Sequence, residues 1–146
     1  MRKFAKISAV LAVMVLALAF VGCKSDDDDD DDPSVVTAWY CTEVDEDGES
    51  VAETIYFYDD NSFKVTESAD GINIDLGNGT YTGDTTKNGK VKITFKKIIK
   101  AAIDISSEST ELIDAPSEFV FELEINGNTM ISLDAGSYID GAWLKK

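Results

Sequence analysis

Strict alternation of apolar and polar residues is the feature of this sequence that most restricts its fold. Residues 89–97 (GKVKITFKK) and 117–127 (SEFVFELEING) show it most clearly, and residues 62–66 and 72–76 repeat it in shorter form. The apolar members are Phe63, Val65, Ile72, Ile74, Leu76, Val91, Ile93, Phe95, Phe119, Phe121, Leu123 and Ile125. A period of two with one apolar face predicts half-buried antiparallel strands.

Short polar segments separate these strands. They are residues 59–62 (DDNS), 86–90 (TKNGK) and 125–129 (INGNT), and each contains Asn together with Asp or Gly. Such residues supply the backbone angles that tight hairpins need. Because each turn joins neighbours in sequence, we expect an all-β, antiparallel up-and-down meander. About eight strands of this kind must close into a barrel, or stack, to hide the apolar face.

Residues 96–117 carry the least regular pattern. The apolar residues of the first half fit one side of a short helix, whereas Ile103 and Ile105 alternate with Asp104 as in a strand. We expect the strand of residues 89–97 to extend into this segment and an acidic loop to follow it.

The first 22 residues have the pattern of a secretory signal peptide. Arg2, Lys3 and Lys6 precede an apolar run over residues 7–21, which is shorter than the stretch of about 20 apolar residues that crosses a membrane as a helix. The run ends in FVGC, which resembles the bacterial lipobox, where a cysteine is acylated and becomes the new N-terminus. The resemblance implies that Cys23 anchors the protein in a membrane. The alternative is an ordinary secreted protein with an incidental cysteine.

Seven consecutive aspartates, residues 26–32, follow this cysteine. A run that repels itself and has no apolar surface stays extended and hydrated, so we expect residues 23–33 to tether a domain formed by residues 34–146. The run also resembles the acidic export signal of some Gram-negative lipoproteins, which implies an outer-membrane location on the cell surface. Calcium binding is least favoured, because Ca²⁺ needs about six to eight converging oxygens.

The composition argues against several classes of function. The chain has no histidine, and 28 acidic residues oppose 13 basic ones, for a net charge of -15. Without histidine the commonest general base and zinc ligand are missing, so we expect no enzyme, no metal site and no cofactor. The acidic balance also argues against nucleic acid as a partner.

Three local features are interpreted as structural. The lysine-rich residues 90–100 are more typical of the solvated face of a strand than of a binding patch. Residues 45–49 (DEDGE) look partly like a calcium loop but lack its spacing, so we expect a hairpin tip. We expect Cys41 to be a half-buried strand residue.

Five segments together resemble the small bacterial lipocalin-like domain. They are TAWYCTEV, IYFYDDNSFKV, GTYTGDTTKNGKVKITF, FVFELEINGNTMISL and GAWLKK. The resemblance covers most of residues 34–146. It implies a barrel with Trp39 as the plug at its closed end and an open mouth that takes up a small hydrophobic ligand.

Aromatic residues occur on nearly every expected strand, and closing the sheet would turn about half of them inward. The candidate ligand-binding residues are Trp39, Phe57, Phe63, Tyr81, Phe95, Phe119 and Phe121. These side chains either line a mouth for a small apolar ligand or fill a solid core. A solid core would leave a surface module that meets a protein partner, as an adhesin or an inhibitor. The resemblance favours ligand binding.

We expect Cys23→Ser to release the protein from the membrane fraction, because serine has no sulfur to acylate and the lipid chains supply the membrane affinity. Cell fractionation with intact-mass analysis of the membrane-bound protein checks this, and Cys41→Ser is the matched control that should stay bound. Membrane retention of the Cys23→Ser protein would contradict the anchor.

Overall fold

The computed structural model describes residues 32–44, 48–104, 106–107, 109–134, 138–139 and 141–146. The signal peptide, Cys23, most of the aspartate run and residues 45–47 of the DEDGE segment lie outside this description. The strands are β1 (Val35–Val44), β2 (Ser50–Tyr58), β3 (Ser62–Ala69), β4 (Ile72–Thr82), β5 (Gly89–Ile99), β6 (Leu112–Asp114), β7 (Val120–Asn126), β8 (Thr129–Ser132) and β9 (Ala142–Lys145).

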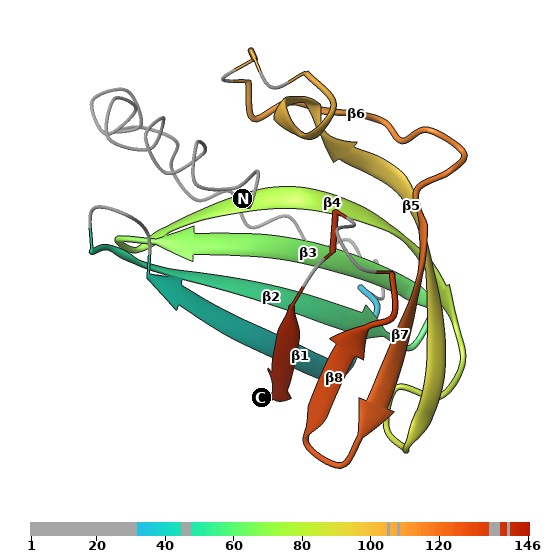
Figure 1. Cartoon of the computed structure of the whole chain (residues 1–146). Helices are drawn as coiled ribbons and strands as arrows, with labels where there is room; N and C mark the ends of the chain where they lie inside the picture. The colour runs from blue at the N-terminus through green and yellow to red at the C-terminus, as the bar shows by residue number, and fades with distance from the viewer. Residues whose placement is uncertain (1–31, 45–47, 105, 108, 135–137, 140) are drawn as a thin grey trace.

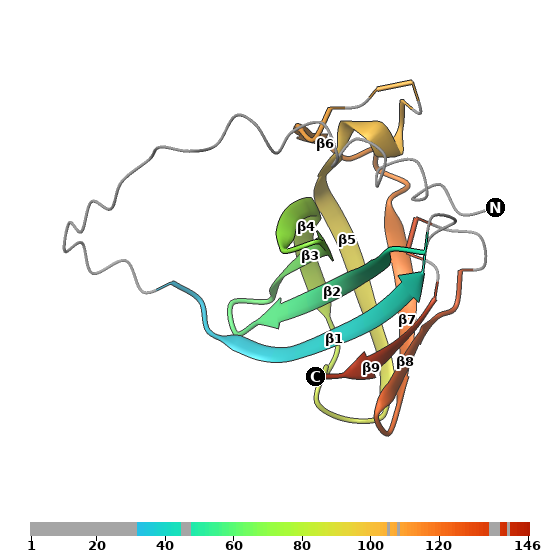
Figure 2. The ribbon, with the colours of Figure 1, turned by 90° about the vertical axis from the view of Figure 1, so that its left-hand side faces the viewer.

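Eight of the described strands close into an antiparallel barrel (Figures 1 and 2). The sheet order is β4-β3-β2-β1-β9-β8-β7-β5, and β4 pairs with β5 to complete the ring. Figure 1 shows β1 to β4 as one curved wall and β5, β7 and β8 as the facing wall. Strand β6 stays outside the ring and pairs with β5 alone. The predicted all-β, up-and-down barrel of about eight strands is confirmed.

The period-two pattern sets which side chains enter the barrel. On β5 and β7 the buried residues alternate with residues that contact solvent, most of them lysine or glutamate. The inward positions that the sequence predicted and that are buried are Phe63, Val65, Ile74, Leu76, Val91, Ile93, Phe95, Phe121, Leu123 and Ile125. Ile72 and Phe119 are half-buried. The apolar face of the sheet has therefore become the interior of the barrel.

The three turns that the sequence predicted lie at one end of the barrel. They join β2 to β3, β4 to β5 and β7 to β8. Asn126 pairs with Thr129, so Gly127 and Asn128 form a two-residue turn. The backbone angle φ of Gly127 is 63°, a value that glycine adopts without steric cost. The Gly127 N–H donates to Oδ1 of Asn88 at 2.8 Å, which ties this turn to the one between β4 and β5.

The irregular segment extends the predicted strand by two residues only, and the strand alternation expected at Ile103 and Asp104 is wrong, because the chain turns there. Strand β5 continues to Ile99, and Ile98 pairs with Ile113 of β6. The 3₁₀ helix η3 (Lys100–Ala102) then leads into the loop. The helical alternative is thus reduced to this one turn between β5 and β6.

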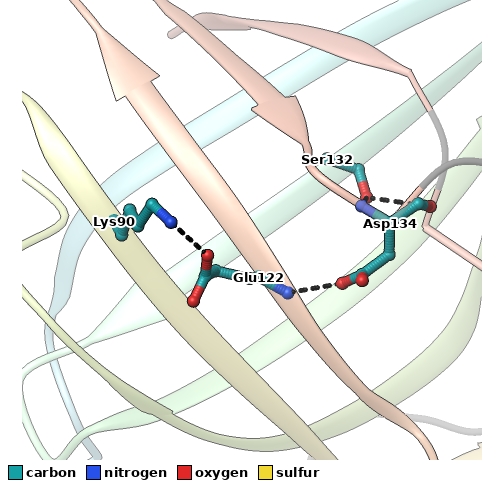
Figure 3. Close-up of polar contacts among 4 residues, drawn as sticks. All are labelled: Lys90, Glu122, Ser132 and Asp134. Carbon is teal, nitrogen blue, oxygen red and sulfur yellow. Dashed lines mark hydrogen bonds and ion pairs between the residues drawn. The ribbon is translucent and has the colours of Figure 1, made fainter.

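A polar network shown in Figure 3 links β5 and β7 to the end of β8. Lys90 Nζ lies 2.7 Å from Oε1 of Glu122, and the backbone N–H of Glu122 donates to Asp134 at 2.8 Å. The Asp134 N–H donates in turn to Oγ of Ser132 at 3.3 Å. Because the Lys90 and Glu122 side chains are largely exposed, this ion pair contributes little to stability. The lysine-rich face is solvated, as expected.

Glycine at position 79 allows β4 to approach β5 closely. Gly79 pairs with Phe95 beside a shift in the β4–β5 register. A methyl group on Gly79 would collide with the carbonyl oxygen of Thr94 and with the ring of Phe63. The carbonyl belongs to the backbone of the neighbouring strand and cannot move aside without disturbing the pairing that closes the barrel.

We expect Gly79→Ala to lower the free energy of unfolding by roughly 3 kcal/mol, because overpacking against backbone forces the strands apart. Urea denaturation followed by circular dichroism measures the change. Asn73→Ala, at an exposed position of the same strand, is the control and should stay within about 0.5 kcal/mol of the parent protein. Equal stability of the two variants would contradict the close approach.

Candidate functional site

Aromatic rings in contact form one cluster in the barrel interior. The ring centroid of Phe57 lies 4.9 Å from that of Tyr81 and 6.3 Å from that of Phe63. Phe63 lies 4.9 Å from Phe95, which lies 5.9 Å from Phe121. None of these five residues is more than 9% exposed. The structure therefore joins five of the candidate ligand-binding residues into one packed cluster.

Trp39 and Phe119 are the other two candidates. Trp39 on β1 is fully buried, and its indole N–H has no hydrogen-bond partner among the described residues; the same holds for Trp143 on the adjacent β9. Phe119 is half-buried, with its ring centroid 5.9 Å from that of Phe121. Phe119 is thus the candidate that keeps contact with solvent.

Two carboxylates face the interior near the end of the barrel where β1 meets β2 and β3 meets β4. Alternation along β1, β2 and β3 directs Cys41, Glu53 and Glu67 inward. Cys41 pairs with Glu53, which pairs in turn with Glu67, so the three side chains lie side by side on adjacent strands. Cys41 and Glu53 are half-buried, as predicted for Cys41. We call the part of the interior around these three residues the acidic end.

Glu67 is the most buried group of the acidic end. It is 2% exposed, and its Oε1 has no hydrogen-bond partner among the described residues. Its cross-strand neighbours are Glu53 on β2 and Ile74 on β4, so neither offers a positive charge. Removal of the carboxylate from water raises the pKa of Glu67 to about 7.

Tyr138 reaches across the barrel toward this region. It lies in the connection between β8 and β9, while its hydroxyl donates at 2.9 Å to the carbonyl oxygen of Leu76 on β4, in the opposite wall. Leu76 lies at the bulge where the β3–β4 register shifts, and such a bulge leaves backbone groups outside the regular ladder. The bulge thus provides an acceptor for a residue distant in sequence.

The Tyr138 ring links the aromatic cluster to the acidic end. Its centroid lies 5.5 Å from that of Phe95 and 5.7 Å from that of Phe119. Burial raises the pKa of the Tyr138 hydroxyl well above its usual range, and the nearby charges of Glu53 and Glu67 raise it further. A ring wall and two carboxylates therefore occupy one region.

Sequence reasoning missed both Glu67 and Tyr138. The signal for Glu67 was present, because the alternation of Phe63 and Val65 continues through Glu67 to Ala69, which is also buried. A charged residue at an inward position of an apolar face is an exception that marks candidate sites. Tyr138 follows from no local pattern, since its partners come from distant strands.

A second acidic group lies at the opposite end of the barrel but offers no comparable site. A hollow of about 430 Å³ is lined by Asp32, Pro33, Ser34, Asp59 and Asp60. The Ser34 N–H donates to Oδ1 of Asp59 at 3.0 Å, and the Asp59 N–H donates to the Ser34 carbonyl at 3.0 Å. These bonds attach the start of the domain to the turn between β2 and β3.

Within the described parts of the chain, no three acidic or cysteine side chains converge as a metal site would require. No helix found in those parts is long and apolar enough to cross a membrane. Comparisons with protein-family models, curated proteins and solved structures find no match to this chain.

We expect Glu67 to contribute to the free energy of unfolding at low pH. This contribution should be lost as the pH rises from about 4.5 to about 7. The folded state holds the proton of Glu67 up to about pH 7, whereas the unfolded chain releases it near 4.5, so the folded state binds more protons in this window. The contribution amounts to about 3 kcal/mol.

Urea denaturation at several pH values, for the parent protein and Glu67→Gln, measures this contribution as the difference between the two curves. Glu122→Gln, on the outer face, is the matched control and should follow the parent. Parallel curves for the parent and Glu67→Gln would contradict the buried, proton-holding carboxyl.

Proposed function

We propose that this protein is a lipid-anchored, exported lipoprotein that binds a small, largely apolar ligand inside its barrel and catalyses no reaction. Unpaired polar atoms in the barrel interior are the main support for ligand binding. Four buried side-chain polar atoms without a partner among the described residues occupy inward positions of barrel strands: Thr37 Oγ1, Trp39 Nε1, Glu67 Oε1 and Trp143 Nε1. An apolar interior with a few unpaired polar groups is typical of a ligand-binding site.

Exposure along β1 and β2 supports entry at the acidic end. Cys41, Val51 and Glu53 occupy inward positions there and yet keep partial contact with solvent. Trp39, Ile55 and Phe57, farther along the same two strands, are fully buried. Along these two strands the inward residues therefore change from partly exposed to fully buried, whereas Glu67 and Ala69 on β3 are buried at the same end.

The attachment of the tether supports the same direction of entry. Strand β1 begins at Val35, beside the hydrogen bonds between Ser34 and Asp59, at the end opposite the acidic end. An anchor at Cys23 would therefore join the domain at the end opposite the acidic end. The tether would leave the acidic end open to a ligand in the surrounding medium.

The architecture also fits this role. Up-and-down barrels of about eight strands are just wide enough to hold one small ligand. The lipocalin-like assignment belongs to this proposal, supported by the closed eight-strand ring and by the buried Trp39 on the first strand.

A surface interaction module is the second candidate function. The aromatic cluster is packed and buried, with none of its five residues more than 9% exposed. In addition, the outer faces of β8 and β9 expose Ile131 by 40% and Leu144 by 50%. These apolar side chains could meet a protein partner, and a protein that takes up no ligand would favour this candidate.

We expect saturable uptake of the uncharged apolar dye N-phenyl-1-naphthylamine by the full chain carrying Cys23→Ser, which avoids detergent. Ala69→Phe should weaken the uptake at least about tenfold, equal to about 1.4 kcal/mol, because the added ring enters the interior beside Glu67. Fluorescence titration measures the affinity, and native mass spectrometry reports any ligand that co-purifies.

Ser68→Phe is the matched control, because it places the same ring on the outer face of β3 and should leave uptake unchanged. Circular dichroism verifies that both variants are folded. Absence of dye uptake and of co-purified ligand in the parent protein would contradict ligand binding.

A further inference from the structure

We propose that the ligand carries a positively charged nitrogen on an apolar body, as a protonated amine or a quaternary ammonium group, and that Glu67 receives the charge. This inference rests on the proposed function and names the chemical class of its ligand. Glu67 provides the carboxylate. Tyr138, whose hydroxyl meets Leu76 near Ile74, the cross-strand neighbour of Glu67, provides an aromatic ring on that side, and Phe119 packs behind Tyr138.

The state of Glu67 is the first argument for a cation. Its side chain is 2% exposed and faces inward, and Oε1 has no hydrogen-bond partner among the described residues. A buried carboxylate is expensive unless it is paired, and a cationic donor is its strongest partner. Glu53 lies directly opposite on β2, and like charges at such positions repel. A cation placed against Glu67 would offset both penalties.

The adjoining rings are the second argument. Tyr138 and Phe119 have centroids 5.7 Å apart and a tilt of 55°, and Tyr138 meets Phe95 edge-on at 5.5 Å. Aromatic faces attract ammonium groups, most strongly where water is excluded. The same rings would pack against the apolar body of the ligand. Carboxylate and rings together thus fit an amphiphilic cation.

Other ligand chemistries fit less well. A metal ion such as Ca²⁺ needs about six to eight oxygens, and the described residues contain no converging group of three acidic or cysteine side chains. An anionic amphiphile would meet Glu53 and Glu67 and a chain whose net charge is -15, which repels anions and concentrates cations. A neutral ligand would leave the Glu67 carboxyl without an ionic partner.

Three ligands that share one apolar chain and differ in charge test the proposal. Decyltrimethylammonium, 1-decanol and decanoate, each below its micellar concentration, are titrated calorimetrically into the full chain carrying Cys23→Ser at pH 8. We expect the cation to bind at least about tenfold more tightly than the alcohol, a difference of about 1.4 kcal/mol. Decanoate should bind most weakly.

Glu67→Gln separates the charge from the shape of the site. We expect this variant to lose the preference for the cation over the alcohol and to keep its affinity for the alcohol. Glu122→Gln removes one carboxylate from the outer face and should keep the preference. Because Gln carries no charge to bury, loss of the preference in a variant that remains folded by circular dichroism cannot be attributed to unfolding.

The outcomes distinguish this inference from the proposed function. If the alcohol binds and the cation binds no more tightly, the cationic ligand class is wrong. If Glu67→Gln keeps the preference, Glu67 does not receive the charge. In both cases ligand binding stands. If none of the three ligands binds, the proposed function fails together with the inference.

Discussion

The pairing of β4 with β5 is the interaction on which the rest of this structure depends. It joins the first four strands to the remaining ones, so that a sheet with two open edges becomes a ring. Closure satisfies edge hydrogen bonds and turns the single apolar face into an interior. It also requires glycine at position 79, where the neighbouring strand leaves no room for a side chain. Without this pairing, Glu67 would lie on an open sheet with access to water.

The barrel encloses an aromatic cluster and an acidic end. Contacting aromatic rings provide much of the apolar burial that stabilises a domain of this size. The acidic end retains a buried carboxyl whose pKa is raised to about 7, at a cost to stability. Proteins keep such exceptions to good packing mainly at functional sites. The interior thus combines a packed aromatic cluster with one buried carboxyl that lowers stability.

Part of the candidate site was predictable from the sequence. Period-two alternation identified the inward aromatic residues, and the same alternation reaches Glu67 when it is followed to the end of β3. It could not show that Phe57, Phe95 and Phe121 belong to one packed cluster, because alternation assigns a face and not a partner. Nor could it identify Tyr138, whose hydrogen bond to Leu76 spans 62 residues of sequence.

The sequence by itself determined the strands, the turns between them and the side of the sheet on which each residue lies. These are local properties, set by the two-residue repeat of an extended chain and by the backbone preferences of Asn, Asp and Gly. Tertiary structure alone decided that β6 stays outside the ring, that Tyr138 crosses the barrel, and that Glu67 is enclosed opposite Glu53. Those outcomes depend on strand register and ring closure, which bring together residues that no local pattern connects.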